Sequence, residues 1–496
     1  MLNATDESAQ SRRARPDWPN LVLLVAYALA IGITIHFHAI WRDEMQAWLI
    51  ARDSADLPSL FHNLHYEGHA ALWYLLLMPL ARLSRDPVLM QTLQFLVATT
   101  TVAMVLWRAP LSLFERALFP FGYFAFYEYA VKSRGYALGC LFVFLFCALW
   151  ARRRQSPVAI ALVLAMTANV DILFMILSIA AVLALIVDWL TVGPADGGKG
   201  DAGWPLYLLA IIVVSCGWTL AVATALPPSD SGVAGWFFGR SPYRLDRVLI
   251  VLSTLFTPHG LNWMSLPTVA ILLVALIRYR ENLPATAFLS TSVLGLLIFF
   301  YTRIPPAPWR SGLIVVAFTA AVWIDRVPAT RASRKALVPP VVFGIVLAFQ
   351  AYAGVKAVWT DLRQPLSRGR DVARFIVEKG WARDPVVGAL DYTTAPIVGY
   401  LGIDRAYYLN ARRWGSFGIW DKRRLEPVDM EQALASATQF APNATLVISP
   451  GIDVDPAILR KFDFVEVAEF SGAVEPFENY TIYRRPTEAT PSPQAH

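Results

Sequence analysis

The architecture of this chain is set out by residues 21–53, which read LVLLVAYALAIGITIHFHAI followed by WRDEMQAWLIARD. The first part is predominantly apolar and long enough to cross the roughly 30 Å hydrocarbon core of a bilayer as one helix. The second part begins with two adjacent acids, Asp43 and Glu44, and continues at amphipathic spacing. A membrane span that ends at a pair of acids predicts a membrane protein with polar groups gathered at the bilayer surface.

The composition of the whole chain agrees with this prediction. Of its 496 residues, 56% are hydrophobic and 16% are charged, and the mean hydropathy is +0.46. A soluble domain carries about 25% charged residues, so a soluble enzyme, a disordered chain and a fibrous repeat are excluded. The three cysteines, Cys140, Cys147 and Cys216, lie within apolar runs and indicate neither a disulfide framework nor a paired CxxC metal site.

Further apolar runs follow the first span and predict a bundle of about eleven to thirteen transmembrane helices. The run 157–190 is long enough for two spans, with a break near Asn169 and Asp171. Between residues 71 and 151 the topology requires an odd number of crossings, yet four runs are present, so one run, such as 71–83 or 117–131, is expected to be short, re-entrant or fused. The later runs cover residues 71–83, 88–107, 117–131, 135–151, 157–190, 205–226, 248–258, 266–278, 284–302, 310–326 and 337–358.

The character of the chain changes after residue 358. Residues 371–381, DVARFIVEKGW, predict an amphipathic helix, and four segments predict strands: PVVGAL, ATLVISP, FDFVEVAEF and ENYTIYRR. The fold class that we predict is an α-helical polytopic membrane protein with a C-terminal soluble α/β domain. Its parts are a cytoplasmic tail (1–20), a transmembrane domain (21–358) with an outer loop (41–70), the soluble domain (359–486) and a disordered tail (487–496).

The basic residues predict which side of the membrane each part occupies. Arg152, Arg153 and Arg154 are expected on the cytoplasmic side, together with the arginines of the N-terminal tail. The 41–70 loop then faces outward, and an odd number of spans places the soluble domain on the same side. Because the basic residues lie mostly in such short loops, the net charge of +6 needs no nucleic-acid partner.

Asp43 and Glu44 form the strongest candidate site. The residues after them, Met45, Trp48 and Ile50, are spaced as on the apolar face of a helix, which predicts a helix lying flat in the membrane interface. A carboxylate held there can deprotonate an acceptor hydroxyl or amine. The alternative is a solvated first helical turn, where acids are favoured by the helix dipole.

A second cluster closes the same loop just before the next apolar run. His62, His65, Glu67 and His69 lie within eight residues, but their spacing fits no standard zinc signature, so a divalent metal is left open. His69 is at the start of the next span, where a cation or hydrogen-bond donor can hold a phosphate. The alternative for His69 is an interfacial histidine with an ordinary hydrogen bond.

Ionisable groups between apolar runs supply further candidates. Lys132 and Arg134, which follow Glu128, are placed to clamp a phosphate or pyrophosphate, or else to anchor the neighbouring spans. Arg310 lies in a proline-rich loop. If this loop is on the outer face, its arginine departs from the positive-inside rule, which favours a role in binding an anionic ligand. Asp171 is a weaker candidate for the lining of the same cavity.

These motifs, in this order, resemble those of the GT-C superfamily of membrane glycosyltransferases, in particular its aminoarabinose-transferase and protein O-mannosyltransferase-like members. The family has an Asp-Glu pair on an outer loop after its first span, which implies that Asp43 is the catalytic base and Glu44 its companion. A family element of His or Lys before Pro-Pro-Leu-Tyr-Tyr is similar to the stretch from His69 to Tyr74, although two alanines replace the prolines. An Arg before a Tyr-Ala-Leu segment is matched by Arg134.

The resemblance implies a function for the chain. It implies transfer of a sugar, with inversion, from a polyprenyl-phosphate-linked donor to a glycan, lipid or protein acceptor on the outer face of the bacterial inner membrane. The phosphate would be held by His69, Arg134 and also Lys132 or Arg310, and His65 and Glu67 would line the site or hold a metal. The sequence has no nucleotide-binding P-loop, dinucleotide fingerprint or GxSxG elbow, which fits a lipid phosphate as the leaving group. The alternatives are a transporter or flippase that uses Asp171 for coupling, and a non-catalytic assembly partner.

Overall fold

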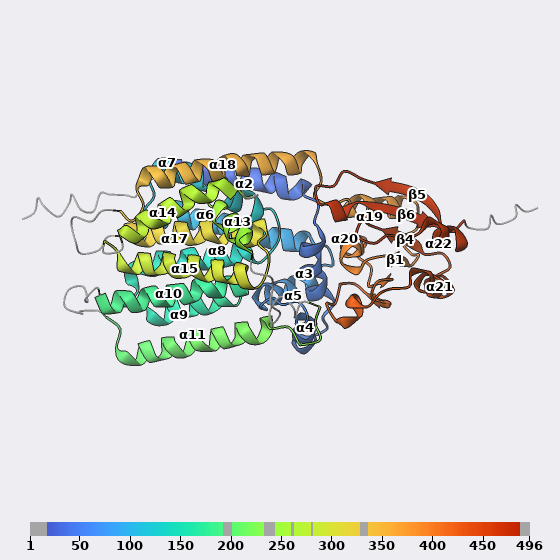
Figure 1. The fold of residues 1–496 in the computed structure, drawn as a ribbon, viewed down its shortest axis with the longest axis horizontal. Coiled ribbons are helices and arrows are strands. Elements are labelled where there is room, and N and C mark those ends of the chain that lie inside the picture. Colours follow the sequence, from blue (N-terminus) through green and yellow to red (C-terminus); the bar gives the residue numbers. More distant parts are fainter. Residues whose placement is uncertain are drawn as a thin grey trace, which may run out of the picture.

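The computed structural model describes residues 17–191, 201–232, 244–258, 262–278, 281–327 and 336–486. A long bundle of helices occupies one end of the molecule, and a domain of strands and helices built from the C-terminal part of the chain occupies the other (Figure 1). The first sixteen residues of the predicted cytoplasmic tail and the predicted disordered tail, 487–496, lie outside the described residues.

Within the described ranges, six helices are long and apolar enough to cross a membrane, so the chain is a multi-pass membrane protein. Four shorter apolar helices, α5 (Leu72–Leu83), α8 (Tyr136–Leu149), α9 (Pro157–Ala168) and α14 (Ser265–Ile277), lie among them, together with α13 (Leu245–Ser253) and α17 (Leu313–Arg326). The total of eleven to thirteen crossings stays a prediction. The six long helices are α2 (Trp18–Phe37), α6 (Val88–Arg108), α10 (Ile172–Thr191), α11 (Trp204–Ala225), α15 (Leu283–Thr302) and α18 (Pro340–Arg363).

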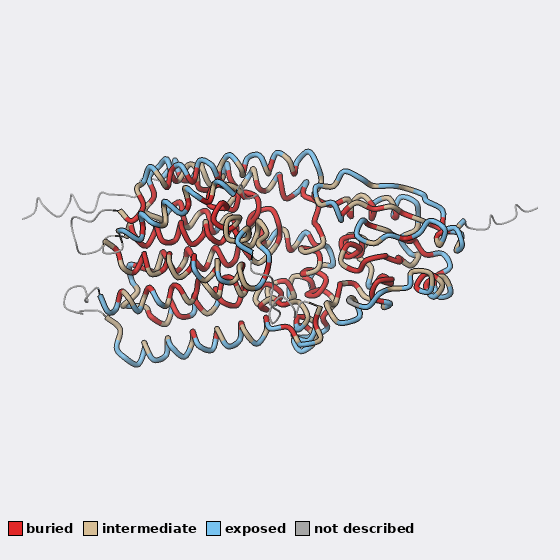
Figure 2. Tube along the Cα trace, viewed as in Figure 1, coloured by how far each residue is buried: buried red, intermediate tan, exposed pale blue. Residues whose placement is uncertain are grey.

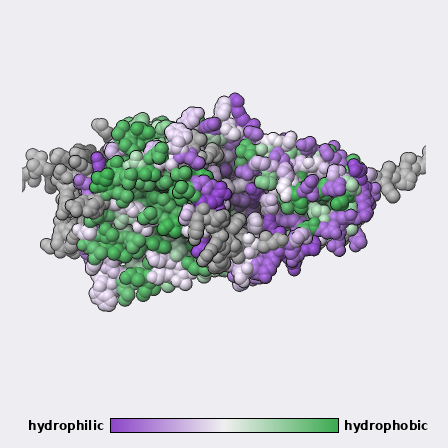
Figure 3. All heavy atoms as spheres, in the orientation of Figure 1, coloured by the Kyte–Doolittle hydropathy of each residue, from purple (hydrophilic) through white to green (hydrophobic). Residues whose placement is uncertain are grey.

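The outer surface of the bundle is apolar, as a lipid environment requires. Hydrophobic residues cover most of its visible face, whereas hydrophilic residues dominate the C-terminal domain (Figure 3). Buried residues line the inside of the bundle and exposed ones its periphery (Figure 2). Exposed Ile211 and Leu29 illustrate the pattern, since both are large apolar side chains on membrane helices. The backbone N–H and C=O groups of such helices form hydrogen bonds within the helix, because lipid offers them no partners.

The apolar run 157–190 divides as predicted, into α9 and α10. The Asn169 amide donates to the carbonyl of Ala165 at 2.8 Å and to that of Gly217, on α11, at 2.8 Å. A side chain that bonds the backbone in this way competes with the next helical turn. The break leaves Asp171 just before the first residue of α10, at the end of the bundle that faces the C-terminal domain.

The run 117–131 is the irregular one between residues 71 and 151. It consists of α7 (Leu113–Leu118), a 3₁₀ turn η1 (Phe119–Phe121) and a π-helical turn η2 (Phe124–Glu128). Short π-helical segments are frequently found at functional sites. The segment that follows η2 carries Lys132, Ser133 and Arg134 into the junction between the bundle and the C-terminal domain.

The C-terminal domain contains a six-stranded mixed sheet in the order β3-β2-β1-β4-β6-β5. The predicted strands are confirmed as β1 (Val386–Gly388), β4 (Thr445–Ile448), β5 (Val465–Phe470) and β6 (Tyr480–Arg484), and the predicted helix as α19 (Gly369–Glu378). Parallel pairing of β1 with both β2 and β4 places helices as crossovers around the sheet. The elements not predicted are β2 (Ala406–Tyr408), β3 (Arg413–Gly415), α20 (Asp391–Leu401), α21 (Met430–Phe440) and α22 (Pro456–Lys461).

The 41–70 loop forms two helices at the junction, α3 (Arg42–Asp53) and α4 (Leu57–Leu64). The prediction of a helix after Asp43 is confirmed, but the prediction that it lies flat in the lipid interface is wrong. Met45, Trp48 and Ile50 are fully buried inside the protein, because α3 packs between α5 and α20. Gly399 of α20 allows this contact, since a Cβ there would lie only 2.1 Å from the Met45 sulfur.

Candidate active site

A cavity of about 260 Å³ lies at the junction between the helical bundle and the C-terminal domain. It brings together the start of α3, the turn before α5, the segment before α8, the turn between α9 and α10, and α16 (Pro308–Ser311). Six of the sequence-predicted residues meet there: Asp43, Glu67, His69, Arg134, Asp171 and Arg310. The rest of the lining is Arg42, Gln46, Ala47, Trp73, Tyr74, Gly135, Tyr136, Val170, Tyr392 and Trp420.

Asp43 lies in the first turn of α3, at the wall of the cavity. The start of the helix is fixed by Glu44, whose side chain accepts a hydrogen bond from the backbone N–H of Trp41 at 3.3 Å. About a third of the Asp43 side chain remains exposed (34%). Its Oδ2 lies 3.3 Å from Nη1 of Arg134, and its Oδ1 lies 3.8 Å from Nε of Arg42. Asp43 is therefore a partly accessible carboxylate within a positively charged setting.

Arg134 places a permanent positive charge beside Asp43. Burial would lower the pKa of this guanidinium, but Asp43 and the other acidic groups around it together outweigh that effect and raise the pKa above its usual value. The guanidinium carbon lies 5.0 Å from the ring centre of Trp309, within cation–π range. Among the described residues, Nε1 of Trp73 has no hydrogen-bond partner, and Nη1 of Arg134 has only its ion pair with Asp43. Both are donors on cavity-lining side chains, which suits an oxygen-rich ligand.

His69 and Asp171 form a second polar pair in the cavity. Nδ1 of His69 lies 3.0 Å from Oδ2 of Asp171, and the backbone N–H of Leu173 donates to the other oxygen at 2.9 Å. Burial alone would raise the pKa of Asp171, but these hydrogen bonds and the charge of His69 lower it. The contact uses Nδ1 and leaves Nε2 for another partner. Asp171 thus lines the cavity, as its position between two spans indicated.

Glu67 contributes the most perturbed carboxyl group of the cavity. Burial raises its pKa to about 7, against the opposing influence of His69 and of a hydrogen bond from Gln46. The Gln46 amide donates to Glu67 at 2.7 Å and also bonds the backbone of Gly418 in the C-terminal domain. The turn before α5 is thereby held to both α3 and the C-terminal domain.

Four other predicted residues lie outside the cavity: Glu44, Lys132, His62 and His65. Glu44 is fully buried behind the cavity wall, where its oxygens accept bonds from His38, Trp41 and Ser133. Lys132 pairs with Glu128 at 3.1 Å, on the same side of the wall as Glu44. His62 and His65 are exposed on and after α4, and the His65 ring packs against Tyr66.

The candidate metal ligands are not brought together. Among the residues that the structure describes, there is no group of three or more His, Cys, Asp or Glu side chains that could hold a metal ion. His62 and His65 point to solvent while Glu67 turns toward Gln46, so the spacing in sequence does not become a coordination sphere. The possible divalent metal stays a prediction.

Tyr392 and Trp420 complete the cavity from the C-terminal domain. Their rings stack at a centroid distance of 6.3 Å, and Arg424 lies 3.6 Å from the Trp420 ring centre. No sequence signal pointed to these residues, because they lie about 350 residues after Asp43 in an otherwise unassigned domain. Gln46, one turn after Asp43 on α3, is the cavity residue that helical periodicity could have indicated.

The fold is that of an α-helical polytopic membrane protein with a C-terminal α/β domain, as predicted. The chain is similar to ArnT from Cupriavidus metallidurans bound to undecaprenyl phosphate, with a TM-score of 0.57, 14% sequence identity, and coverage of 93% of this chain and 97% of that one. It is also similar to the apo state of that ArnT, with a TM-score of 0.50 and the same identity and coverage. No protein-family model matches the chain, and no curated protein matches its sequence.

Proposed function

We propose that this chain is a membrane glycosyltransferase that moves a sugar from a polyprenyl-phosphate-linked donor to an acceptor. The observation that carries the proposal is the cavity itself, where the Asp43 carboxylate faces Arg134, His69 and Arg310. A partly exposed carboxylate close to basic side chains suits a reaction that removes one proton and releases one phosphate. The similar fold of an ArnT solved with undecaprenyl phosphate supports a lipid phosphate as the donor's carrier.

In this mechanism Asp43 takes the proton of the acceptor hydroxyl or amine. At the same time the oxygen or nitrogen of the acceptor attacks the anomeric carbon of the sugar. The bond from that carbon to the phosphate oxygen breaks, and the phosphate leaves with the electron pair. Attack opposite the leaving group inverts the anomeric configuration. Arg134, His69 and Arg310 stabilise the negative charge that develops on the phosphate, which is commonly the largest electrostatic contribution to such a step.

The proposal includes an orientation in the membrane. The cavity and the C-terminal domain face outward from the bacterial inner membrane, and Arg153 and Arg154 mark the cytoplasmic end. These two arginines bind Asp188 at the end of α10 remote from Asp171, at 2.7 and 3.5 Å. Their distance from the cavity along α10 supports opposite sides of the bilayer for the two groups. The acceptor would then be a glycan, lipid or protein at the outer surface.

The decisive experiment measures transfer from a radiolabelled polyprenyl-phosphate sugar in membranes that contain the chain. Asp43→Asn is expected to abolish transfer, because the amide cannot accept the proton, while the protein stays folded in the membrane. Asp404→Asn is the control, since that carboxylate is 86% exposed on the C-terminal domain and remote from the cavity. Near wild-type turnover by Asp43→Asn would contradict the assignment of the base, and no transfer by the wild-type chain would contradict the function.

A further inference from the structure

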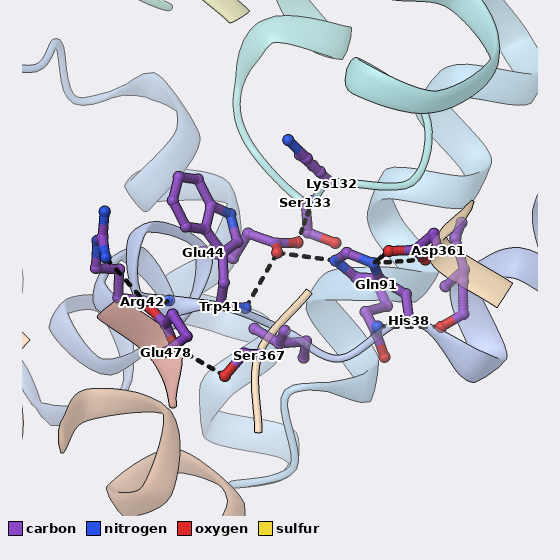
Figure 4. A network of polar contacts seen from close by, with 12 residues as sticks. His38, Trp41, Arg42, Glu44, Gln91, Lys132, Ser133, Asp361, Ser367 and Glu478 are labelled. Atoms are coloured by element: carbon purple, nitrogen blue, oxygen red, sulfur yellow. Dashed lines mark hydrogen bonds and ion pairs between the residues drawn. The ribbon is translucent and has the colours of Figure 1, made fainter. Parts of the chain in front are cut away.

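Behind the cavity wall, a fully buried imidazole bridges two carboxylates that are far apart in sequence. His38 Nε2 lies 3.0 Å from Glu44 Oε2, and His38 Nδ1 lies 3.0 Å from Asp361 Oδ2 (Figure 4). The hydroxyl of Tyr127 donates to Asp361 at 3.1 Å. Both ring nitrogens face carboxylate oxygens, so the arrangement favours the doubly protonated imidazolium.

The surroundings of His38 keep this charge in place. It follows the last turn of α2, and it faces Glu44 of α3, Asp361 of α18 and, through Asp361, Tyr127 of η2. Burial would lower the pKa of the imidazole, but the two carboxylates together raise it to about 10. Arg370 of α19 donates to the backbone carbonyls of Phe37 and His38 at 3.0 and 3.4 Å, which holds the turn that carries the ring.

Glu44 connects this buried charge to both members of the catalytic pair. One of its oxygens accepts the backbone N–H of Ser133, the residue before Arg134. The other accepts the backbone N–H of Trp41, at the start of the helix that carries Asp43. A single carboxylate therefore holds the two segments whose side chains meet at 3.3 Å in the cavity. Glu44 itself does not line the cavity.

We infer that His38, Glu44 and Asp361 form a positioning cluster that sets the separation between Asp43 and Arg134. The inference rests on the proposed function and adds positioning residues to it. Three buried charges are an expensive way to obtain stability, because apolar residues of similar volume are often equally stabilising. The cluster instead gives what catalysis needs, since a misplacement of about 1 Å can lower a rate about 100-fold.

A second capping-box glutamate provides a matched control. Glu115 starts α7 in the same way that Glu44 starts α3, and it binds a partly buried cation, Arg326, at 2.7 Å. It lies near Asn20 and Arg116, at the end of the bundle remote from the cavity. Glu115→Gln should therefore reduce stability without changing the turnover of the molecules that stay folded.

The kinetic test is a double-mutant cycle between His38→Gln and Asp43→Glu, measured on purified full-length chain with radiolabelled polyprenyl-phosphate sugar. His38→Gln is expected to lower kcat by about 10–100-fold and to change the donor KM by less than about twofold. In the Asp43→Glu background, where the base is already displaced, the same substitution should lower kcat by less than about threefold. Equal losses in both backgrounds would overturn the inference, as would wild-type kcat in His38→Gln. If the His38→Gln variant does not fold, the same measurements are made on Asp361→Asn, because the asparagine amide oxygen can still accept the hydrogen bond from Tyr127.

A second measurement is independent of activity. In a chain carrying Asp43→Cys and Cys216→Ser, Arg134 should make a negatively charged methanethiosulfonate react faster than a positively charged one. Cys140 and Cys147 are buried and should not interfere. His38→Gln should reduce this preference by about threefold or more, while Glu115→Gln should leave it unchanged. An unchanged preference in His38→Gln would contradict the positioning role even if the chain transferred no sugar.

Discussion

At the scale of single residues, the cavity separates groups that look equivalent in sequence. Asp43 and Glu44 are adjacent, yet successive residues of a helix point about 100° apart. Asp43 therefore faces the cavity and Glu44 the buried positioning cluster. His69 and His65 are separated in the same way, because only His69 is paired with Asp171. The role of each side chain in the site therefore depends on the charged groups close to it, and not on its chemical type alone.

His69→Ala is expected to weaken binding of the sugar donor, because the substitution removes a side chain that hydrogen-bonds the phosphate while leaving Asp43 in place. The donor KM should rise by about tenfold, and kcat should fall less. His65→Ala is the matched control, since that imidazole is exposed and outside the cavity. Donor titrations in detergent would measure both variants. An unchanged donor KM in His69→Ala would show that the histidine is only an interfacial residue.

Glu67 predicts a pH dependence of donor binding. Its pKa is raised to about 7 by burial, so the carboxyl is neutral below that pH and negatively charged above it. The added negative charge lies in the same cavity as the phosphate site, so the donor KM should rise as the pH increases through about 7. Glu67→Gln should keep the hydrogen bond with Gln46 and remove the rise. A wild-type KM that is constant between pH 6 and 8 would contradict this prediction.

At the scale of elements, the site depends on irregular backbone that neighbouring helices hold in place. The η1 and η2 turns interrupt a membrane run and lead directly to Arg134, and α18 packs against both of them. Gly354 of α18 makes this packing possible, because a Cβ there would lie 2.2 Å from the carbonyl oxygen of Phe121 and 2.9 Å from the nitrogen of Tyr123. Because these neighbours are backbone atoms, no side chain can move away to make room for the added methyl group.

Gly354→Ala is therefore expected to destabilise the bundle by about 1–3 kcal/mol, the usual cost of overpacking. The midpoint of thermal unfolding in detergent would report the loss. Gly32→Ala is the control, because a Cβ at that position of α2 would meet its nearest neighbour, Phe95, at an ordinary 3.5 Å. Alanine favours helix over glycine, so the control should be neutral or stabilising. Equal unfolding midpoints for the two variants would contradict the packing argument.

At the scale of the whole molecule, the C-terminal domain is part of the active-site architecture. Glu478 of that domain accepts the backbone N–H of Arg42 at 3.0 Å, and it also accepts the hydroxyls of Ser367 at 2.7 Å and Tyr480 at 2.9 Å. The N–H that Glu478 accepts belongs to Arg42, the residue before Asp43. Docking of the domain and the position of the catalytic base are therefore linked through the first turn of α3.

Glu478 predicts that this docking weakens as the pH rises. Burial raises its pKa to about 7 from an ordinary 4.5, so the docked form holds a proton that the undocked form loses between these two pH values. Docking should thus be strongest below about pH 4.5 for this group and weaken as the pH rises to about 7. Glu478→Gln should remove this dependence, and Glu466→Gln, exposed on β5, should not. Limited proteolysis of the domain boundary at pH 5 and pH 8 would measure it, and equal protection of the wild-type chain at both pH values would contradict the prediction.

The sequence by itself determined the membrane class, the terminal α/β domain and a short set of chemically unusual side chains. These features depend on local composition and periodicity: apolar length for the spans, alternation for strands such as β5 and β6, and isolated charge for Asp43, His69, Arg134 and Arg310. The edge strand β3 and the short β2, each of three residues, were not predicted.

Only the tertiary structure decided which of those side chains act together. It brought Asp171 to His69, and Tyr392 and Trp420 to the cavity, and it moved Glu44 and Lys132 behind the wall. It also covered the apolar face of α3 with protein where a lipid surface was expected, and it gave His38, unremarkable in sequence, two buried carboxylates. The physical reason is that hydrophobic pattern records whether a face is buried, whereas the partner that buries it comes from segments hundreds of residues away.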